Sequence, residues 1–146
     1  MKESPVIRIK SYLTFNGNCR EAMLFYKKCL GGELHLQTLG ESVGADQLPK
    51  ALEAYVLQAS LRCPHAEIIA TDLVPDEGWC PGNNIALLLE CRSLNELMQV
   101  YQRLGKGGTA TQRVVPTKTG SYYASLTDRF GIRWMLNFTP EHLTVP

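Results

Sequence analysis

Residues 12–32 read YLTFNGNCREAMLFYKKCLGG, and this stretch decides the fold. Its first four residues are strand-like. Asn18 follows as a helix N-cap, with Glu21 three residues later as in a capping box. Apolar residues then recur at helical spacing until the glycine stop at Gly31-Gly32, and they are Ala22, Phe25, Tyr26, Cys29 and Leu30. The pattern predicts a strand followed by a capped amphipathic helix.

The second half of the chain repeats this pattern without repeating the residues. The strand-like run Ile85–Leu89 leads to Ser93, and Glu96 stands three residues further on. Helical spacing then continues up to Gly105, carried by Leu94, Leu97, Met98, Tyr101 and Leu104. Two copies of one unit predict a pseudo-twofold fold, and sites in such folds tend to lie between the copies.

Further strand-like runs follow each predicted helix. After the first helix they are Leu34–Leu39, Tyr55–Leu61 and Glu67–Asp72, and after the second they are Thr109–Val115, Tyr122–Thr127 and Ile132–Phe138. Cys63-Pro64-His65 predicts a hairpin turn, and Gly40–Lys50 reads as a polar loop. Along Tyr55–Leu61 the alternation assigns two faces: Tyr55, Leu57, Ala59 and Leu61 on the packed face, and Val56, Gln58 and Ser60 on the other.

We therefore predict an α+β fold of two βαβββ modules with curled mixed sheets. The modules span residues 5–74 and 82–140 of one domain, 1–146, and Leu73–Gly82 is the connector. A helix can cover only one face of each sheet. The other faces should line a cleft.

Composition excludes several classes of function. The chain has 146 residues and a formal net charge of +1, so neither nucleic acid nor an anionic membrane is an expected partner. No apolar run of signal-peptide or membrane-spanning length follows Met1–Pro5, which favours a cytoplasmic protein. Five cysteines without a Cys-x-x-Cys pair indicate free thiols in a reducing compartment.

Three segments also carry a family resemblance. Tyr12–Asn18 runs into Ala22-Met23, Phe25-Tyr26 and Leu30–Glu33, and Pro81–Asn84 and Leu126–Met135 continue the match in order. The chain resembles PhnB-like proteins of the glyoxalase, bleomycin-resistance and extradiol-dioxygenase superfamily, also called vicinal oxygen chelate. The likeness covers most of the chain and implies paired βαβββ modules and a homodimer.

Proteins of this kind are often labelled 3-demethylubiquinone methyltransferases. The sequence has no Gly-rich strand-to-helix turn of the type that holds an adenosyl cofactor. We therefore expect no cofactor.

The resemblance also implies where a metal would be held. Metal-dependent members place His, Gln or Glu at four positions, which correspond here to Ser11 or Tyr12, to Thr71 or Asp72, to Asn84 and to Met135. A divalent site needs at least three imidazole or carboxylate ligands to outcompete water. We expect no metal at these positions.

Two further family motifs are altered in this chain. PhnB-like relatives often carry His and Glu two apart on the third strand, where Gln58 and Ser60 stand here, so a proton-transfer role is lost. An aromatic-Gly-x-Arg pattern near the seventh strand is replaced by Thr119, Gly120 and Tyr122.

The strand faces that the helices leave uncovered supply the candidate ligand-binding residues. They are Tyr12, Thr14, Gln58, Ser60, Asn84, Tyr122 or Tyr123, Arg133, Met135 and Asn137. This set is neutral and rich in hydrogen-bonding groups, with one guanidinium, which suits a polar or anionic small molecule. In the alternative interpretation, the polar groups satisfy strand edges and Arg133 is a solvated surface charge.

The preferred function is metal-independent binding of a small molecule by a homodimer, in the manner of the drug-sequestering branch of the superfamily. The alternative is an enzyme, either a lyase or dioxygenase with relocated metal ligands or a metal-free isomerase. A third class, a structural or interaction protein, lacks support because the chain has no extended basic, coiled-coil or membrane-binding surface.

Overall fold

A computed structural model describes residues 6–42 and 44–141 of the chain; Pro5, the predicted first residue of the first module, lies outside them. The chain divides into two compact units, Met1–Trp79 and Cys80–Pro146. The boundary falls within the predicted connector Leu73–Gly82. None of the described helices is long and apolar enough to cross a membrane.

The first unit is one four-stranded sheet with one helix. Its elements are β1 (Ser11–Thr14), α1 (Cys19–Leu30), β2 (Glu33–Thr38), β3 (Val56–Cys63) and β4 (Ala66–Thr71). The strand order is β1-β4-β3-β2, in which β1 runs parallel to β4 and the other pairs are antiparallel. The predicted polar loop between β2 and β3 contains three 3-10 turns, Leu39–Glu41, Ala45–Gln47 and Lys50–Leu52.

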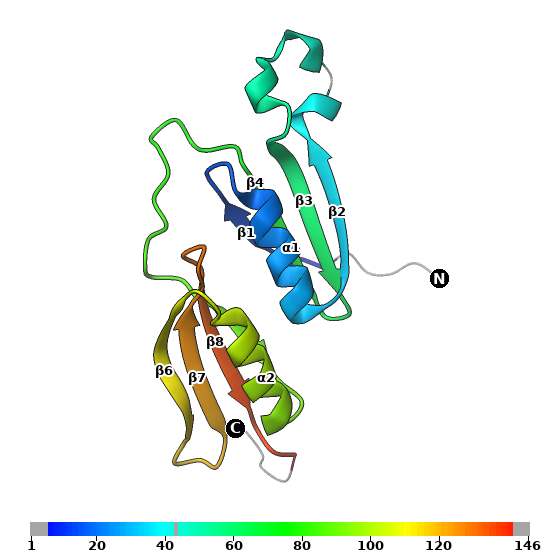
Figure 1. Cartoon of the computed structure of the whole chain (residues 1–146). Coiled ribbons are helices and arrows are strands. Elements are labelled where there is room, and N and C mark those ends of the chain that lie inside the picture. The colour runs from blue at the N-terminus through cyan, green and yellow to red at the C-terminus, as the bar shows by residue number, and fades with distance from the viewer. Residues whose placement is uncertain (1–5, 43, 142–146) are drawn as a thin grey trace, which may run out of the picture. The chain divides into compact units, whose positions relative to one another are not determined.

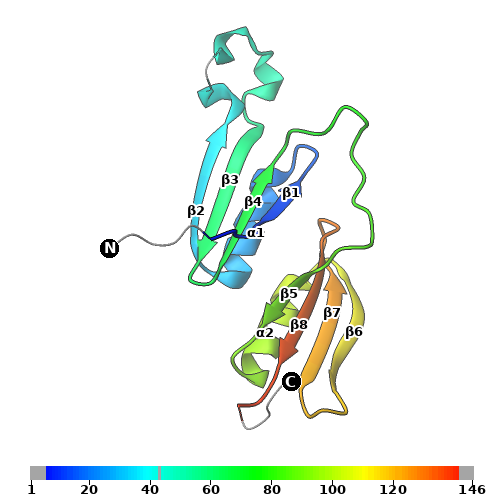
Figure 2. The ribbon, with the colours of Figure 1, turned by 180° about the vertical axis from the view of Figure 1, so that it is seen from behind.

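The second unit repeats this arrangement. Its elements are β5 (Leu87–Glu90), α2 (Leu94–Leu104), β6 (Thr109–Pro116), β7 (Tyr122–Thr127) and β8 (Arg133–Phe138). The order β5-β8-β7-β6 and the parallel β5–β8 pair match the first sheet. In each unit the helix lies on one face of the sheet (Figure 1), and the view from behind shows the strands in front of the helix (Figure 2). The predicted α+β fold with a repeated βαβββ order is confirmed.

The fifth strand is shorter than the sequence predicts. It begins at Leu87, which pairs with Trp134, whereas Ile85 is 75% exposed. Because β8 itself begins at Arg133, it offers no strand partner for Ile85. An apolar run becomes a strand only where a neighbouring strand can pair with it.

Glycine ends the first helix as predicted. Gly31 caps α1 at a φ of 77°, a left-handed conformation that glycine adopts without steric cost. Gly32 follows at a φ of 96°, and a Cβ there would lie 2.6 Å from the Arg62 carbonyl oxygen. The glycine pair therefore allows β2 to start close against β3.

The two helix N-termini are capped differently. Ser93 accepts a hydrogen bond from the Glu96 N–H at 3.0 Å, as predicted, and Glu96 Oε1 accepts one from the Arg92 N–H at 2.9 Å. The prediction of a side-chain cap by Asn18 is wrong, because the Asn18 side chain makes no cap bond.

Asp72, just after β4, takes over this role in the first unit. Its Oδ1 accepts hydrogen bonds from the N–H groups of Gly17 and Cys19, both at 3.0 Å. Its Oδ2 accepts a third from the Val56 N–H at 2.8 Å, and the side chain is almost fully buried. One carboxylate thus joins the start of α1 to the start of β3 and the end of β4.

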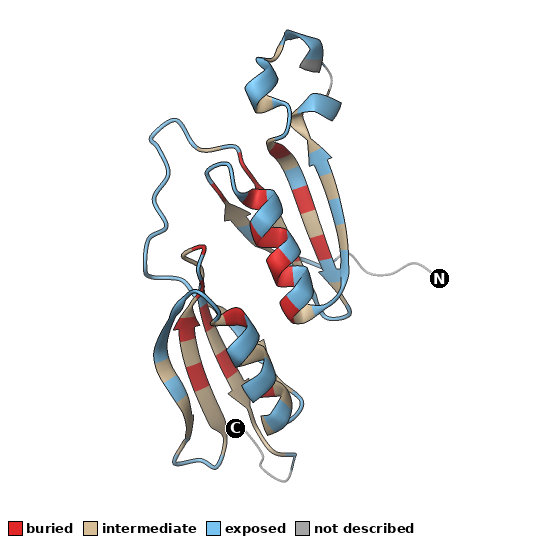
Figure 3. Cartoon of the chain, in the orientation of Figure 1, coloured by how far each residue is buried: buried red, intermediate tan, exposed pale blue. Residues whose placement is uncertain are grey.

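Each unit has its own apolar core between helix and sheet. The largest buried side chains of the first core are Phe15, Met23, Tyr26, Val56 and Leu61, and those of the second are Leu97, Leu104, Leu126, Trp134 and Leu136. Buried residues alternate with accessible ones along β3, β7 and β8 (Figure 3). This is the pattern of a sheet packed on one face.

Val56 corrects the predicted faces of the third strand. The sequence places it with Gln58 and Ser60, yet it is fully buried. The register shows why: Gln37 pairs with Gln58 and Thr38 with Val56, so Leu57 is the extra residue of a β-bulge. The bulge resets the alternation.

Replacing Asp72 by alanine should destabilise the protein by roughly 3 kcal/mol or more. Each buried N–H left without an acceptor costs about 1–3 kcal/mol. The substitution removes the acceptor of two buried N–H groups, those of Cys19 and Val56, and of the part-buried Gly17 N–H. Urea denaturation measures the effect. Asp76→Ala, in the exposed connector, is the matched control. A decrease in the free energy of unfolding of less than about 1 kcal/mol for Asp72→Ala would contradict the role given to this carboxylate.

Candidate functional site

The helix-free face of the first sheet carries an ordered set of polar side chains. Strand register aligns Tyr12 with Ile69, Ile69 with Ser60, and Ser60 with His35. The neighbouring row aligns Glu67 with Arg62 and Arg62 with Glu33. These rows face away from α1. The residues that alternate with them along β3 and β4, such as Ala59, Leu61 and Ala70, are buried on the opposite face.

Glu67 is the centre of the contacts on this face. Its Oε1 accepts a hydrogen bond from Ser60 Oγ at 3.0 Å, and its Oε2 pairs with Lys10 Nζ at 2.9 Å. Arg62 Nε lies further away, 3.5 Å from Oε1. The hydrogen bond from Lys10, followed by that from Ser60, holds the pKa of the Glu67 carboxyl below its ordinary value. Glu67 is therefore an engaged carboxylate at neutral pH.

An open hollow of about 370 Å³ lies beside this carboxylate, over β2 and β3. It is lined by His35, Leu36, Gln37, Gln58, Ser60 and Arg62. Two predicted ligand-binding residues, Gln58 and Ser60, are therefore brought together in one concavity. Its volume is within the range of small-molecule pockets.

Sequence reasoning missed Arg62, His35 and Glu67, which lie in or beside this hollow. Arg62 stands at i+2 from Ser60 and i+4 from Gln58, so strand alternation would have placed it on the same face. Alternation along β3 cannot place His35 and Glu67, because they stand on β2 and β4. They reach the hollow and its rim through the β2–β3 and β3–β4 registers, which the sequence does not specify.

Two predicted ligand-binding residues lie on the same face but outside the hollow. Tyr12, 62% exposed, and Thr14, half-buried, stand on β1, at the opposite edge of the sheet from β2. The Thr14 carbonyl accepts a hydrogen bond from Trp79 Nε1 at 2.8 Å. This bond anchors the connector to β1 through Trp79.

The second sheet presents four of the predicted residues on its own helix-free face. Tyr123 pairs in register with Asn137, Ser125 with Met135, and Thr127 with Arg133. The Arg133 guanidinium is exposed and donates a hydrogen bond to the Asn83 carbonyl. Thr111 and Ser125 hydroxyls lie 2.7 Å apart on the same face. This face is half-buried and polar.

Tyr122 and Asn84 stand elsewhere in the second unit. Tyr122 shares the face of Ala124 and Leu126, under α2, and stacks on Phe138 with ring centroids 6.3 Å apart. Of the two tyrosines, Tyr123 is the one on the helix-free face. Asn84 lies three residues before β5, in the exposed segment that leads into the strand rather than at the strand's start.

The positions at which the superfamily implies a metal do not fit one. Asp72 uses both carboxylate oxygens on backbone N–H groups, and Thr71 Oγ1 donates to the Leu57 carbonyl at 2.8 Å. Met135 offers only a thioether. Within residues 6–42 and 44–141, no three His, Cys, Asp or Glu side chains are grouped so that they could hold a metal ion.

A family model and a curated protein each match most of the chain. Residues 7–137 match the family model described as 3-demethylubiquinone-9 3-methyltransferase. The chain is 25% identical to protein YjdN of Escherichia coli K12 over 145 residues, covering 93% of this chain and 98% of that one.

Several solved structures have the same fold as this chain. Protein PA1353 from Pseudomonas aeruginosa is 30% identical, with a TM-score of 0.80 over 91% of this chain and 98% of that one. The PhnB protein from Bacillus cereus is 20% identical, with a TM-score of 0.69 over 91% of this chain and 100% of that one. Glyoxalase-related and glyoxalase/bleomycin-resistance proteins match at TM-scores of 0.57 to 0.62 and 13% to 21% identity, which shows the fold alone.

Trp134 and Arg133 test the two faces of β8. Trp134 is 1% exposed and donates to Asp128 Oδ2 at 2.8 Å, so Trp134→Ala should cost roughly 3–5 kcal/mol of unfolding free energy. Arg133→Met removes an exposed side chain and should change stability by about 0.5 kcal/mol or less. Thermal and urea unfolding measure both. Equal losses in the two variants would contradict the face assignment.

Proposed function

Because the chain belongs to the 3-demethylubiquinone-9 3-methyltransferase family and has the fold of glyoxalase/bleomycin-resistance proteins, we propose that it binds a polar or anionic small molecule on a helix-free sheet face without a resident metal ion. The hollow formed by Gln58, Ser60 and Arg62 is the observation that carries the proposal. It is a concavity of pocket size with converging hydrogen-bonding groups.

Two features favour binding over proton-transfer catalysis. Gln58 and Ser60 stand where relatives often carry His and Glu, and neither side chain titrates near neutral pH. The carboxylate beside the hollow, Glu67, is a weak base because its pKa is lowered by hydrogen bonds from Lys10 and Ser60. The hollow thus offers groups that orient a ligand, and the Glu67 carboxylate beside it is already engaged.

The methyltransferase description of the family supplies no activity for this chain by itself. In the part of the chain that the structure describes, the β1–α1 and β5–α2 connections, residues 15–18 and 91–93, contain a single glycine, Gly17. A Gly-rich strand-to-helix turn that could hold an adenosyl cofactor is therefore not among the described residues.

The remaining candidates complete the proposed ligand contacts on each sheet. In the first unit these are Tyr12 and Thr14, and in the second they are Tyr123, Arg133, Met135 and Asn137. Their hydroxyl, amide and guanidinium groups suit the same class of ligand.

Ligand binding is tested by screening polar and anionic fragments against the ¹⁵N-labelled protein by NMR. Fragments should shift the amide signals of residues 35–37 and 58–62, and Gln58→Ala should weaken those that bind, because it removes two donors and an acceptor. Gln102→Ala, on the exposed face of α2, is the control. A screen without a saturable shift on either helix-free face would refute the proposal.

Metal independence is tested by elemental analysis of protein purified without chelator. We expect well below one Zn, Fe, Ni or Mn per chain, because the implied ligand positions are occupied by Asn84, Met135 and the engaged Asp72. About one tightly bound ion per chain would overturn this part of the proposal.

A symmetric homodimer is also proposed. Each four-stranded sheet has two edge strands, and Leu88 on the edge strand β5 is exposed in the single chain. Light scattering at micromolar concentration should therefore give twice the chain mass. The mass of one chain would be the opposing result.

A further inference from the structure

We infer that the hollow recognises a carboxylate or phosphate group of its ligand through Arg62, and that Lys10 is a positioning residue that keeps this guanidinium available. The inference rests on the proposed function and deepens it. It names the chemical class of the ligand and assigns a role to a lysine outside the hollow.

The groups that line the hollow favour an anion. They include the Arg62 guanidinium, the His35 imidazole and the primary amides of Gln37 and Gln58, and no carboxylate is among the lining residues described. Glu33, which lies 3.1 Å from His35 Nε2, is largely exposed and does not line the hollow. Arg62 is therefore the permanent positive charge of this site.

Competition for Glu67 leaves Arg62 loosely held. Lys10 Nζ lies 2.9 Å from Glu67 Oε2, and Ser60 Oγ donates to Glu67 Oε1 at 3.0 Å. Arg62 Nε lies further away, 3.5 Å from Glu67 Oε1. Charge-assisted N–H···O bonds are normally about 2.7–2.9 Å long. The Arg62 side chain is also 67% exposed, so its guanidinium can turn to a ligand at little cost.

Replacing Lys10 should bring Arg62 into closer contact with Glu67. With Oε2 released, Glu67 can accept Arg62 in a two-bond, side-by-side pair, which is the strongest geometry for a guanidinium and a carboxylate. Arg62 would then be withdrawn from an anionic ligand. Lys10→Met should thus weaken anion binding although Lys10 does not line the hollow.

The test is an NMR titration of the ¹⁵N-labelled full chain with benzoate, phenyl phosphate and the neutral isostere benzamide, following the amides of residues 58–62. Both anions should bind more tightly than benzamide, and the tighter of the two identifies the acidic group. Arg62→Met should weaken both anions by about tenfold or more. Arg20→Met, on α1 and so on the helix-covered side of the sheet, should leave them unchanged.

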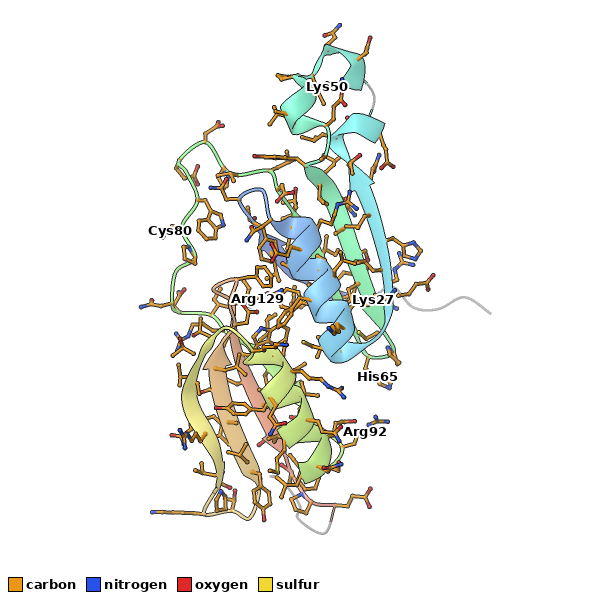
Figure 4. All side chains as sticks on the ribbon, viewed as in Figure 1. Lys27, Lys50, His65, Cys80, Arg92 and Arg129 are labelled. Carbon is orange, nitrogen blue, oxygen red and sulfur yellow. The ribbon has the colours of Figure 1, made fainter. Side chains whose placement is uncertain are left out.

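A second set of variants tests the positioning role. Lys10→Met should weaken the anions about threefold or more, and adding Glu67→Gln should restore binding, because the competing charge is then gone. Lys27→Met, which removes a lysine from α1 (Figure 4), is the matched control for lost charge. Benzamide binding should be the same in all these variants.

The outcomes separate the two proposals. Equal binding of benzamide and the anions, insensitive to Arg62→Met, would overturn anion recognition while leaving small-molecule binding in place. Lys10→Met behaving like Lys27→Met would overturn the positioning role. Absence of any saturable shift with all three probes at residues 58–62 would remove the hollow as a binding site altogether.

Discussion

In each unit a buried aspartate carboxylate holds neighbouring segments in place by accepting three hydrogen bonds. Asp72 accepts from Gly17, Cys19 and Val56 N–H groups, fixing the start of α1 against β3 and β4. Asp128 accepts hydrogen bonds from the N–H groups of Phe130 and Ile132 and from the Trp134 indole. These bonds hold the β7–β8 turn against the buried Trp134 side chain. Burying such a charge is favourable only when its oxygens are satisfied, so the start of α1 must stay against β3 and β4, and the β7–β8 turn must stay against the Trp134 indole.

That arrangement decides where chemistry is possible. With α1 on one face of the first sheet, the alternate residues of β2, β3 and β4 face away from the core. Among the described residues, these alternate positions carry Ser60, Arg62 and Glu67 beside the apolar Ile69. The hollow and its charge balance are thus consequences of which face the helix covers, and the site needs no specialised loop.

Much of the fold could be predicted from the sequence, because its signals are local. Helical spacing, the Gly31 stop and the Pro64-His65 turn act within a few residues, and all three are found in the structure. The Asp72 cap could not be predicted, since its partners Gly17 and Cys19 lie 55 and 53 residues away. The bulge at Leu57 and the partners of Arg62 depend on strand register, which the alternation of side chains alone does not fix. That Gln58 and Ser60 lie on one strand face could be predicted, because alternation along the strand suffices for two residues that are two positions apart.

A crystal structure of the protein grown with phenyl phosphate would show whether Arg62 binds the anion, since it locates the anion rather than its effects. We expect phosphate oxygens within hydrogen-bond distance of the Arg62 guanidinium, over β2 and β3, with Lys10 still paired to Glu67. Phosphate bound elsewhere, with Arg62 turned onto both oxygens of Glu67, would contradict this expectation.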